Sequence, residues 1–119
     1  MKNRYKKVYS LSHQAGYRNY TVKDLLDLKG RKKMTQINVI SPAEASAAET
    51  AGIDMIITGT NRLKEIREAA PNTFLTCGPN YTGHETKEKM MKEVFELVRI
   101  GVDSIHTNSW NINFIKYLS

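Results

Sequence analysis

The fold is decided by residues 41–58, which have the sequence SPAEASAAETAGIDMIIT. Ser41 and the proline after it predict a helix start, and Glu44 completes a capping box. The alanine-rich segment that follows ends at Gly52, because a residue without a Cβ adopts the left-handed conformation of a helix end. Residues 55–58 are apolar and β-branched, so they predict a strand. The stretch is one helix joined by a tight turn to one strand.

Helix and strand signals alternate on both sides of this stretch, with capping residues, glycines and a proline at the boundaries. The expected elements are a helix from Thr21 to Gly30, a strand over 34–40, a helix over 42–51, a strand over 55–58, a helix carrying Leu63 and Ile66 that Pro71 ends, a strand over 74–77, a helix over 84–100 with an apolar stripe from Met90 to Val98, a strand over 104–107 and the beginning of a helix over 111–118.

This alternation predicts an α/β fold with parallel strands, either an open doubly wound sheet or a closed barrel. The joint Ala51–Met55, in which Gly, an apolar residue and Asp precede a strand, recurs at Ile100–Ser104, as repeated barrel units would. A complete TIM (β/α)8 barrel takes roughly 250 residues. We therefore expect parallel βα repeats forming about half of such a barrel over residues 21–119, truncated at its carboxyl end.

Positive charge is concentrated at the amino terminus, where residues 1–33 hold ten Lys/Arg against two acids, while residues 34–119 hold eight against ten. Residues 1–20 show no sustained hydrophobic period, so we interpret them as a basic arm that is ordered only where other residues hold it. Such an arm can contact phosphates. It lacks the arginine and aromatic density of a dedicated nucleic-acid surface, so nucleic acid is not a favoured partner.

Composition excludes several classes of protein. The 119 residues are 40% hydrophobic and 25% charged, which is typical of a globular domain. No apolar run approaches the roughly 20 residues of a membrane helix, and the first residues lack the apolar core of a signal peptide. Cys77 is the single cysteine, so no intrachain disulfide can form, and we expect a reducing, cytoplasmic location.

Polar residues follow the predicted strands and are expected to gather at one edge of the sheet. They are Asn38, Ser41, Thr58, Thr60, Asn61, Thr76, Cys77, Asn80, His106, Thr107, Asn108 and Ser109. Two interpretations remain open: these side chains only cap helices, or they also bind a carboxylate or carbonyl group. His106 and Cys77 alone among them are suited to acid-base or nucleophilic chemistry near neutral pH. They are weak catalytic candidates, because a lone cysteine is usually a small core residue.

His84 and Glu88 lie four residues apart, on one face of a predicted helix. The second histidine of the zinc protease motif is missing. Acidic residues at this helix start are better explained by the favourable helix dipole.

Two stretches resemble the amino-terminal part of the ketopantoate hydroxymethyltransferase family, which belongs to the phosphoenolpyruvate mutase and isocitrate lyase superfamily of barrels. They are residues 21–35, TVKDLLDLKGRKKMT, and 49–59, ETAGIDMIITG. Residues 70–75 and 101–105 look like the family's approaches to its third and fourth strands. The resemblance implies a magnesium-dependent transfer of a hydroxymethyl group from methylenetetrahydrofolate to 3-methyl-2-oxobutanoate, a step toward pantothenate, by a homo-oligomer.

The sequence matches the family at positions that form helices, strands and turns. It differs from the family at the positions of the metal ligands. The family's metal-ligand positions fall on Thr60, Cys77 and Asn108, all neutral, whereas Mg²⁺ prefers anionic oxygen ligands. We therefore predict no magnesium site of the family type. The family's later catalytic base lies beyond Ser119. The residues that the resemblance places around a small 2-oxo acid are Thr60, Asn61, Cys77, His106 and Asn108.

Three functions stay open. The chain is a member, or a fragment of a member, of this hydroxymethyltransferase-like family. Alternatively, it is another lyase or transferase of the superfamily that holds its oxo acid through neutral hydrogen bonds. The third hypothesis is a non-catalytic, degenerate half-barrel that acts as an interaction module. The unpaired edges of a half-barrel predict a partner, either the rest of a barrel or another copy of the chain.

Overall fold

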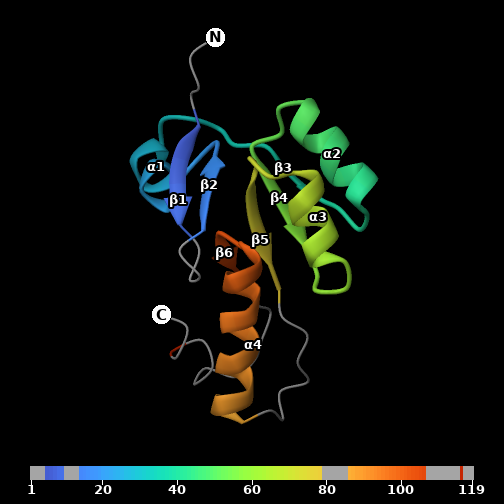
Figure 1. The fold of residues 1–119 in the computed structure, drawn as a ribbon. Helices are drawn as coiled ribbons and strands as arrows, with labels where there is room; N and C mark the ends of the chain where they lie inside the picture. Colours follow the sequence, from blue (N-terminus) through green and yellow to red (C-terminus); the bar gives the residue numbers. More distant parts are fainter. Residues whose placement is uncertain (1–4, 10–13, 79–85, 107–115, 117–119) are drawn as a thin grey trace.

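The computed structural model describes residues 5–9, 14–78, 86–106 and 116. Its centre is a parallel sheet whose strands lie in chain order: β3 (Gln36–Asn38), β4 (Met55–Thr58), β5 (Phe74–Cys77) and β6 (Ser104–Ile105). The connecting helices are α2 (Pro42–Thr50), α3 (Leu63–Ala69) and α4 (Lys87–Ile100) (Figure 1). Passing from each strand to its parallel neighbour through a helix is the connectivity of a βα barrel. The predicted α/β class and half-barrel arrangement are confirmed.

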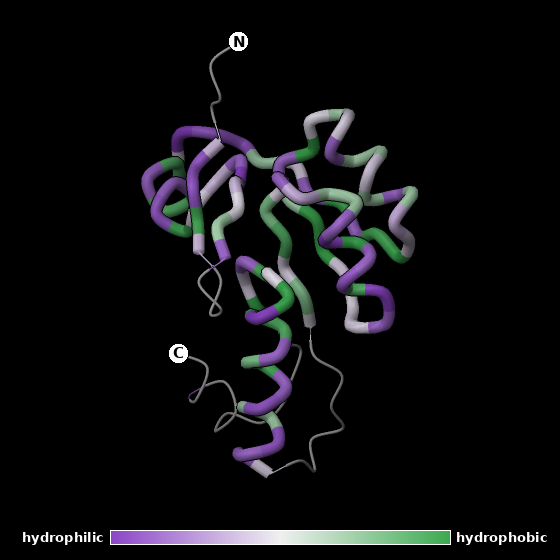
Figure 2. Tube along the Cα trace, in the orientation of Figure 1, coloured by the Kyte–Doolittle hydropathy of each residue, from purple (hydrophilic) through white to green (hydrophobic). Residues whose placement is uncertain are grey.

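All three connecting helices pack on the same face of the sheet. Ile56 of β4 pairs in register with Leu75 of β5, and both belong to the buried core. Residues of α2, α3 and α4, including Ala45, Ile66 and Leu97, complete that core. Because side chains alternate between the faces of a strand, the neighbours of these core residues point to the other face. Figure 2 shows hydrophobic residues along the strands of the sheet. Along α4, hydrophobic residues alternate with hydrophilic ones.

Local signals fixed the helix ends largely as predicted. The first helix, α1, spans Val22–Leu28 and starts with a capping box between Thr21 and Asp24. Ser41 caps α2 by accepting a hydrogen bond from the Glu44 backbone amide. At the end of α4, Gly101 adopts a φ of 113°, which favours glycine.

Some boundaries differ from the prediction or fall outside the described residues. Thr86 is the N-cap of α4, so the expected start at residue 84 lies in the undescribed stretch 79–85, together with His84. Strand β3 is shorter than the expected 34–40. Thr107 and nearly all of the expected helix over 111–118 also lie outside the described residues.

The described residues of the predicted basic arm before Thr21 are ordered, and other parts of the chain hold them. Strands β1 (Lys6–Tyr9) and β2 (Ala15–Arg18) form an antiparallel hairpin. The hairpin is attached to the sheet through its last residue and the asparagine that follows. Asn19 donates a hydrogen bond to the Asp54 carbonyl at 2.9 Å and accepts one from the Phe74 amide at 2.9 Å.

Arg18 is buried in an ionic cluster that the sequence did not predict. It forms a salt bridge of 3.0 Å with Asp103, and Arg67 of α3 reaches the same carboxylate at 3.1 Å. Both guanidinium groups also donate to the Gly101 carbonyl. Burial and the neighbouring charge of Arg18 lower the pKa of Arg67 to about 10. The cluster therefore connects the hairpin to α3 and to the turn before β6.

Helix α1 does not bury the apolar side that its sequence predicted. None of its residues is fully buried, and Val22 and Leu26 are 56% and 67% exposed. Among the described residues, none of the helices is both long and apolar enough to cross a lipid bilayer.

Candidate functional site

The carboxyl ends of β5 and β6 carry a hydrogen-bonded row of polar side chains. Thr76 Oγ1 lies 3.3 Å from Ser104 Oγ and 3.1 Å from His106 Nδ1. Thr76 pairs in register with Ser104, and His106 follows β6 directly. All three lie on the face opposite the helices, where Thr76 is buried, Ser104 is half-buried and His106 is exposed. This is the edge at which βα barrels place their chemistry.

Gly78 positions the ring of His106. A Cβ atom built at Gly78 would lie 2.6 Å from His106 Nε2, closer than side chains tolerate. The imidazole therefore lies directly against the glycine backbone at the end of β5. His106 remains exposed, so it combines a fixed orientation with access to solvent.

The structure does not bring Cys77 and His106 together. Cys77 pairs in register with Ile105, and its side chain belongs to the core between sheet and helices. His106 is one residue further along, so it points to the opposite face. Burial, with a contribution from the charge of Glu93, raises the pKa of Cys77 to about 11. Cys77 thus has the environment of a core thiol and not that of a nucleophile.

The other predicted site residues lie at the same edge but further along it. Thr60 and Asn61 follow β4, which β5 separates from β6. Neither caps the next helix, because the N-cap position of α3 is Arg62, whose side chain makes no capping hydrogen bond. Asn108, like Asn80, Thr107 and Ser109, lies outside the described residues.

Two of the polar residues at the strand ends have structural roles. Ser41 caps α2, and Thr58 is buried and donates a hydrogen bond to the Val39 carbonyl at 2.9 Å. Capping and strand pairing explain these side chains. They do not explain Thr76, Ser104 and His106, whose polar groups bond to one another on the face opposite the helices.

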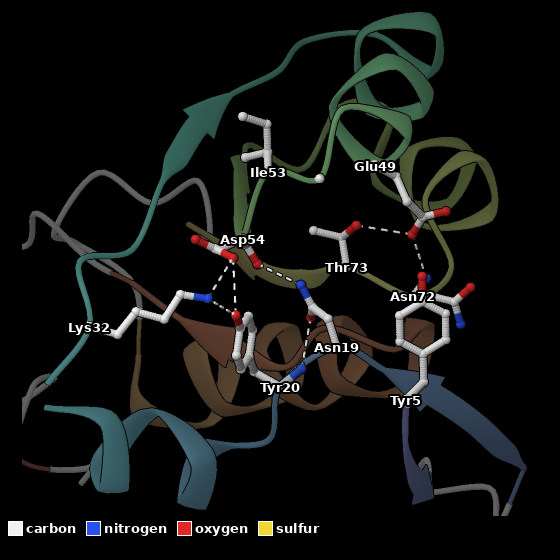
Figure 3. Close-up of a pocket in the computed structure, with 10 residues that line it drawn as sticks. Tyr5, Asn19, Tyr20, Lys32, Glu49, Ile53, Asp54, Asn72 and Thr73 are labelled. Atoms are coloured by element: carbon white, nitrogen blue, oxygen red, sulfur yellow. Dashed lines mark hydrogen bonds and ion pairs between the residues drawn. The ribbon is translucent and has the colours of Figure 1, made fainter. Parts of the chain in front are cut away.

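A polar cavity of about 390 Å³ lies at the opposite, amino-terminal edge of the sheet. Its lining side chains come from the hairpin region and from the turns before β4 and β5 (Figure 3). Asp54 is held on one side by Thr35, Tyr20 and Lys32, with the Lys32 ammonium 3.6 Å away. Burial acts to raise the pKa of Asp54, but these hydrogen bonds and the lysine charge keep it below its ordinary value.

Glu49 forms the other polar wall of this cavity. One of its carboxylate oxygens accepts hydrogen bonds from the Asn72 amide at 2.7 Å and the Thr73 hydroxyl at 2.9 Å (Figure 3). The tyrosine rings of residues 5 and 20 contribute aromatic surface. Sequence reasoning missed this cavity, because its residues come from five separate segments without a common motif.

Comparison with curated proteins gives a distant match. The chain is 22% identical, over an alignment of 106 residues, to 3-methyl-2-oxobutanoate hydroxymethyltransferase from Kosmotoga olearia. The match takes in 71% of this chain and 40% of that enzyme, so the chain spans well under two thirds of its relative. No protein-family model matches the sequence, and no solved structure matches it. The match supports a distant relationship to this enzyme.

The described residues at the carboxyl edge do not fit a magnesium ion. The side chains that follow the strands there are Asn38, Thr60, Asn61 and His106, none of which is anionic. Within the described ranges, no group of three His, Cys, Asp or Glu side chains is arranged to hold a metal ion. Mg²⁺ gives up its water reluctantly and usually needs carboxylates or phosphates to do so. We derive no step through a metal here.

Proposed function

We propose that this chain is part of a hydroxymethyltransferase-like βα barrel and that it binds a small 2-oxo acid at the carboxyl ends of β5 and β6. The observation that carries the proposal is the hydrogen-bonded row formed by Thr76, Ser104 and His106, whose solvent-exposed member is His106. Its position matches the site location common to barrel enzymes. The distant similarity to an enzyme whose name specifies a 2-oxo acid supports the same substrate class.

The side chains of this row have the chemistry that such a substrate needs. The Thr76 hydroxyl donates to Ser104 Oγ, which leaves the proton of the Ser104 hydroxyl as a hydrogen-bond donor for a carboxylate or carbonyl oxygen. The imidazole of His106 is the side chain of this row that can accept a proton from carbon. Hydroxymethyl transfer requires removal of a proton from the carbon beside the carbonyl. We assign the removal of this proton to His106. Methylenetetrahydrofolate would supply the one-carbon group and water its hydroxyl oxygen, and tetrahydrofolate would leave.

Binding and turnover test the two parts of the proposal separately. We expect 3-methyl-2-oxobutanoate to bind with and without Mg²⁺ in calorimetry, and amide resonances near Thr76 and Ser104 to shift in NMR. His106→Gln should keep binding within a few-fold and lose hydroxymethyl transfer from methylenetetrahydrofolate. Lys64→Ala, an exposed change on α3, is the control. Loss of binding in Lys64→Ala, or binding that absolutely requires Mg²⁺, would contradict the proposed site.

Gly78→Ala is a sharper test of the same site. The added methyl group displaces the ring of His106 without removing any polar group. We expect a loss of turnover similar to that of His106→Gln in a protein that still folds. Gly59→Ala, after β4, has open space for its methyl group and serves as the matched control.

A second function is favoured by a different observation. Large apolar side chains of α1 and of the β3 region are exposed, among them Leu26 at 67% and Ile40 at 76%. Exposed apolar residues next to an unpaired strand edge are typical of an interaction surface. A non-catalytic half-barrel would show neither oxo-acid binding nor turnover, and it would associate through this surface.

A further inference from the structure

The cavity at the amino-terminal edge of the sheet contains two carboxylates, Asp54 and Glu49, and the fold engages them unequally. Asp54 is fully engaged, because its oxygens accept from Thr35 and Tyr20 and pair with Lys32. Glu49 is engaged through one oxygen only. Its second oxygen accepts no hydrogen bond, and the carboxylate forms no salt bridge, within the part of the chain that the structure describes.

The charge of the lining favours a cation. Lys32 and Asp54 form an ion pair, so Glu49 is the charged lining residue without a salt bridge, although it lies close enough to Arg67 of α3 for their charges to interact. Glu49 is partly buried, and its pairing with a ligand cation would therefore be screened less than at the open surface. The chain as a whole has a net charge of +6, so this negative site stands out from its surroundings.

The volume and the remaining walls favour an organic body on that cation. A volume of about 390 Å³ lies within the range of roughly 300–1,000 Å³ typical of small-molecule pockets. Tyr5 and Tyr20 contribute rings, and Ile53 contributes an apolar side chain (Figure 3). Lys32 lies over the Tyr20 ring, 5.0 Å from its centroid, so this face of the ring already holds an ammonium group and Glu49 is left as the partner of a ligand cation.

We propose that this cavity binds a small organic cation, a primary ammonium group carried on an apolar or aromatic body. The ammonium group donates a charge-assisted hydrogen bond to the free oxygen of Glu49. The apolar body lies among Ile53 and the two tyrosine rings. The site lies at the opposite end of the strands from Thr76 and His106, so it does not rest on the proposed 2-oxo acid site.

Two probes that differ only in charge test this site on the unaltered protein. Benzylammonium and its neutral counterpart benzyl alcohol would be titrated by NMR and calorimetry at low salt. We expect benzylammonium to bind at least tenfold more tightly and to shift resonances around Glu49, Ile53 and Thr73. Equal affinity for the two probes, preference for benzoate, no saturation at millimolar concentrations, or shifts confined to the His106 edge would overturn the proposal.

A charge-neutral variant then identifies the residue. Glu49→Gln retains an oxygen for the hydrogen bonds from Asn72 and Thr73, so the fold should survive, which circular dichroism checks. It should bind benzylammonium about tenfold more weakly than the unaltered protein. Glu44→Gln, an exposed acid of the same helix, should bind it unchanged. Equal affinity in Glu49→Gln and Glu44→Gln would overturn the assignment.

Discussion

Asp103 is the single residue on which two distant arginines converge. Arg18 from the hairpin and Arg67 from α3 are both largely buried, and their guanidinium groups share this carboxylate and the Gly101 carbonyl. Two cations placed this close repel each other unless an anion lies between them. The attachment of the hairpin therefore depends on one acidic side chain.

Asp103→Asn should destabilise the protein strongly, because it leaves two buried cations without their anion. Breaking a buried ion pair costs about 3–5 kcal/mol of unfolding free energy. Urea denaturation followed by circular dichroism measures the change. Asp27→Asn is the matched control, since Asp27 pairs with Lys23 at the exposed surface of α1 and such pairs contribute about 0–1 kcal/mol. Equal effects of the two substitutions would contradict a structural role for the cluster.

Because the pKa of Cys77 is raised in the folded protein, we expect the free energy of unfolding to fall at alkaline pH. The pKa of Cys77 in the folded protein is raised from 9.0 to about 11, so between these values the unfolded chain releases a proton that the folded chain retains. This contribution to stability is present below pH 9 and is lost as the pH rises toward 11. Urea midpoints should therefore fall more steeply over this window in the unaltered protein than in Cys77→Ala. At pH 7.5, alkylation by iodoacetamide should require unfolding, and rapid modification of the native protein would contradict the burial.

At the scale of secondary-structure elements, the end of α4 depends on a glycine. Gly101 has a φ of 113°, and a Cβ atom there would lie 3.3 Å from the Arg67 side chain. Gly101→Ala should destabilise the protein by about 1–2 kcal/mol, the cost of a left-handed conformation for a residue with a side chain. Gly59→Ala, which meets open space, should change the urea midpoint little. Similar midpoints for the two variants would contradict this role.

Helices and strands whose ends depend on residues close by in the sequence could be predicted. Elements held in place by residues far away in the sequence could not. Thr21, Ser41 and Gly101 mark helix ends through hydrogen bonds and backbone angles within a few residues, so the sequence alone indicates them. The hairpin carries no apolar alternation. Its attachment depends on Arg18 meeting Asp103, which lies 85 positions away in the sequence.

The candidate site was predictable in position but not in composition. Polar residues after the strands indicated the carboxyl edge, and His106 lies there. The register between neighbouring strands decides whether a side chain at this edge points into the core or to the opposite side of the sheet. The pairing of Cys77 with Ile105 places the thiol and the imidazole on opposite faces. A shift of one residue would have joined them, and no local sequence signal fixes that register.

At the scale of the whole molecule, the parallel sheet has two outer strands. β3 and β6 each have a sheet neighbour on one side only, among the described elements. In a closed barrel the first and last strands pair, so neither edge remains. Ile37, 42% exposed, lies in β3, and Ile40 follows this strand. The predicted partner is another copy of the chain or the rest of a barrel. It would cover the unpaired strand edges and the exposed isoleucine side chains.

The 119-residue chain should therefore self-associate in a concentration-dependent way, which sedimentation velocity measures. Ile37→Lys should shift the distribution toward monomer, because a lysine on an edge strand opposes pairing with another strand. Val22→Lys introduces the same charge at an exposed apolar position of α1 and separates the strand edge from the helix surface. Should Val22→Lys dissociate the assembly while Ile37→Lys does not, the exposed side of α1 is the interface. A monomer at all concentrations would contradict association through either surface and remove the main physical argument for a partner.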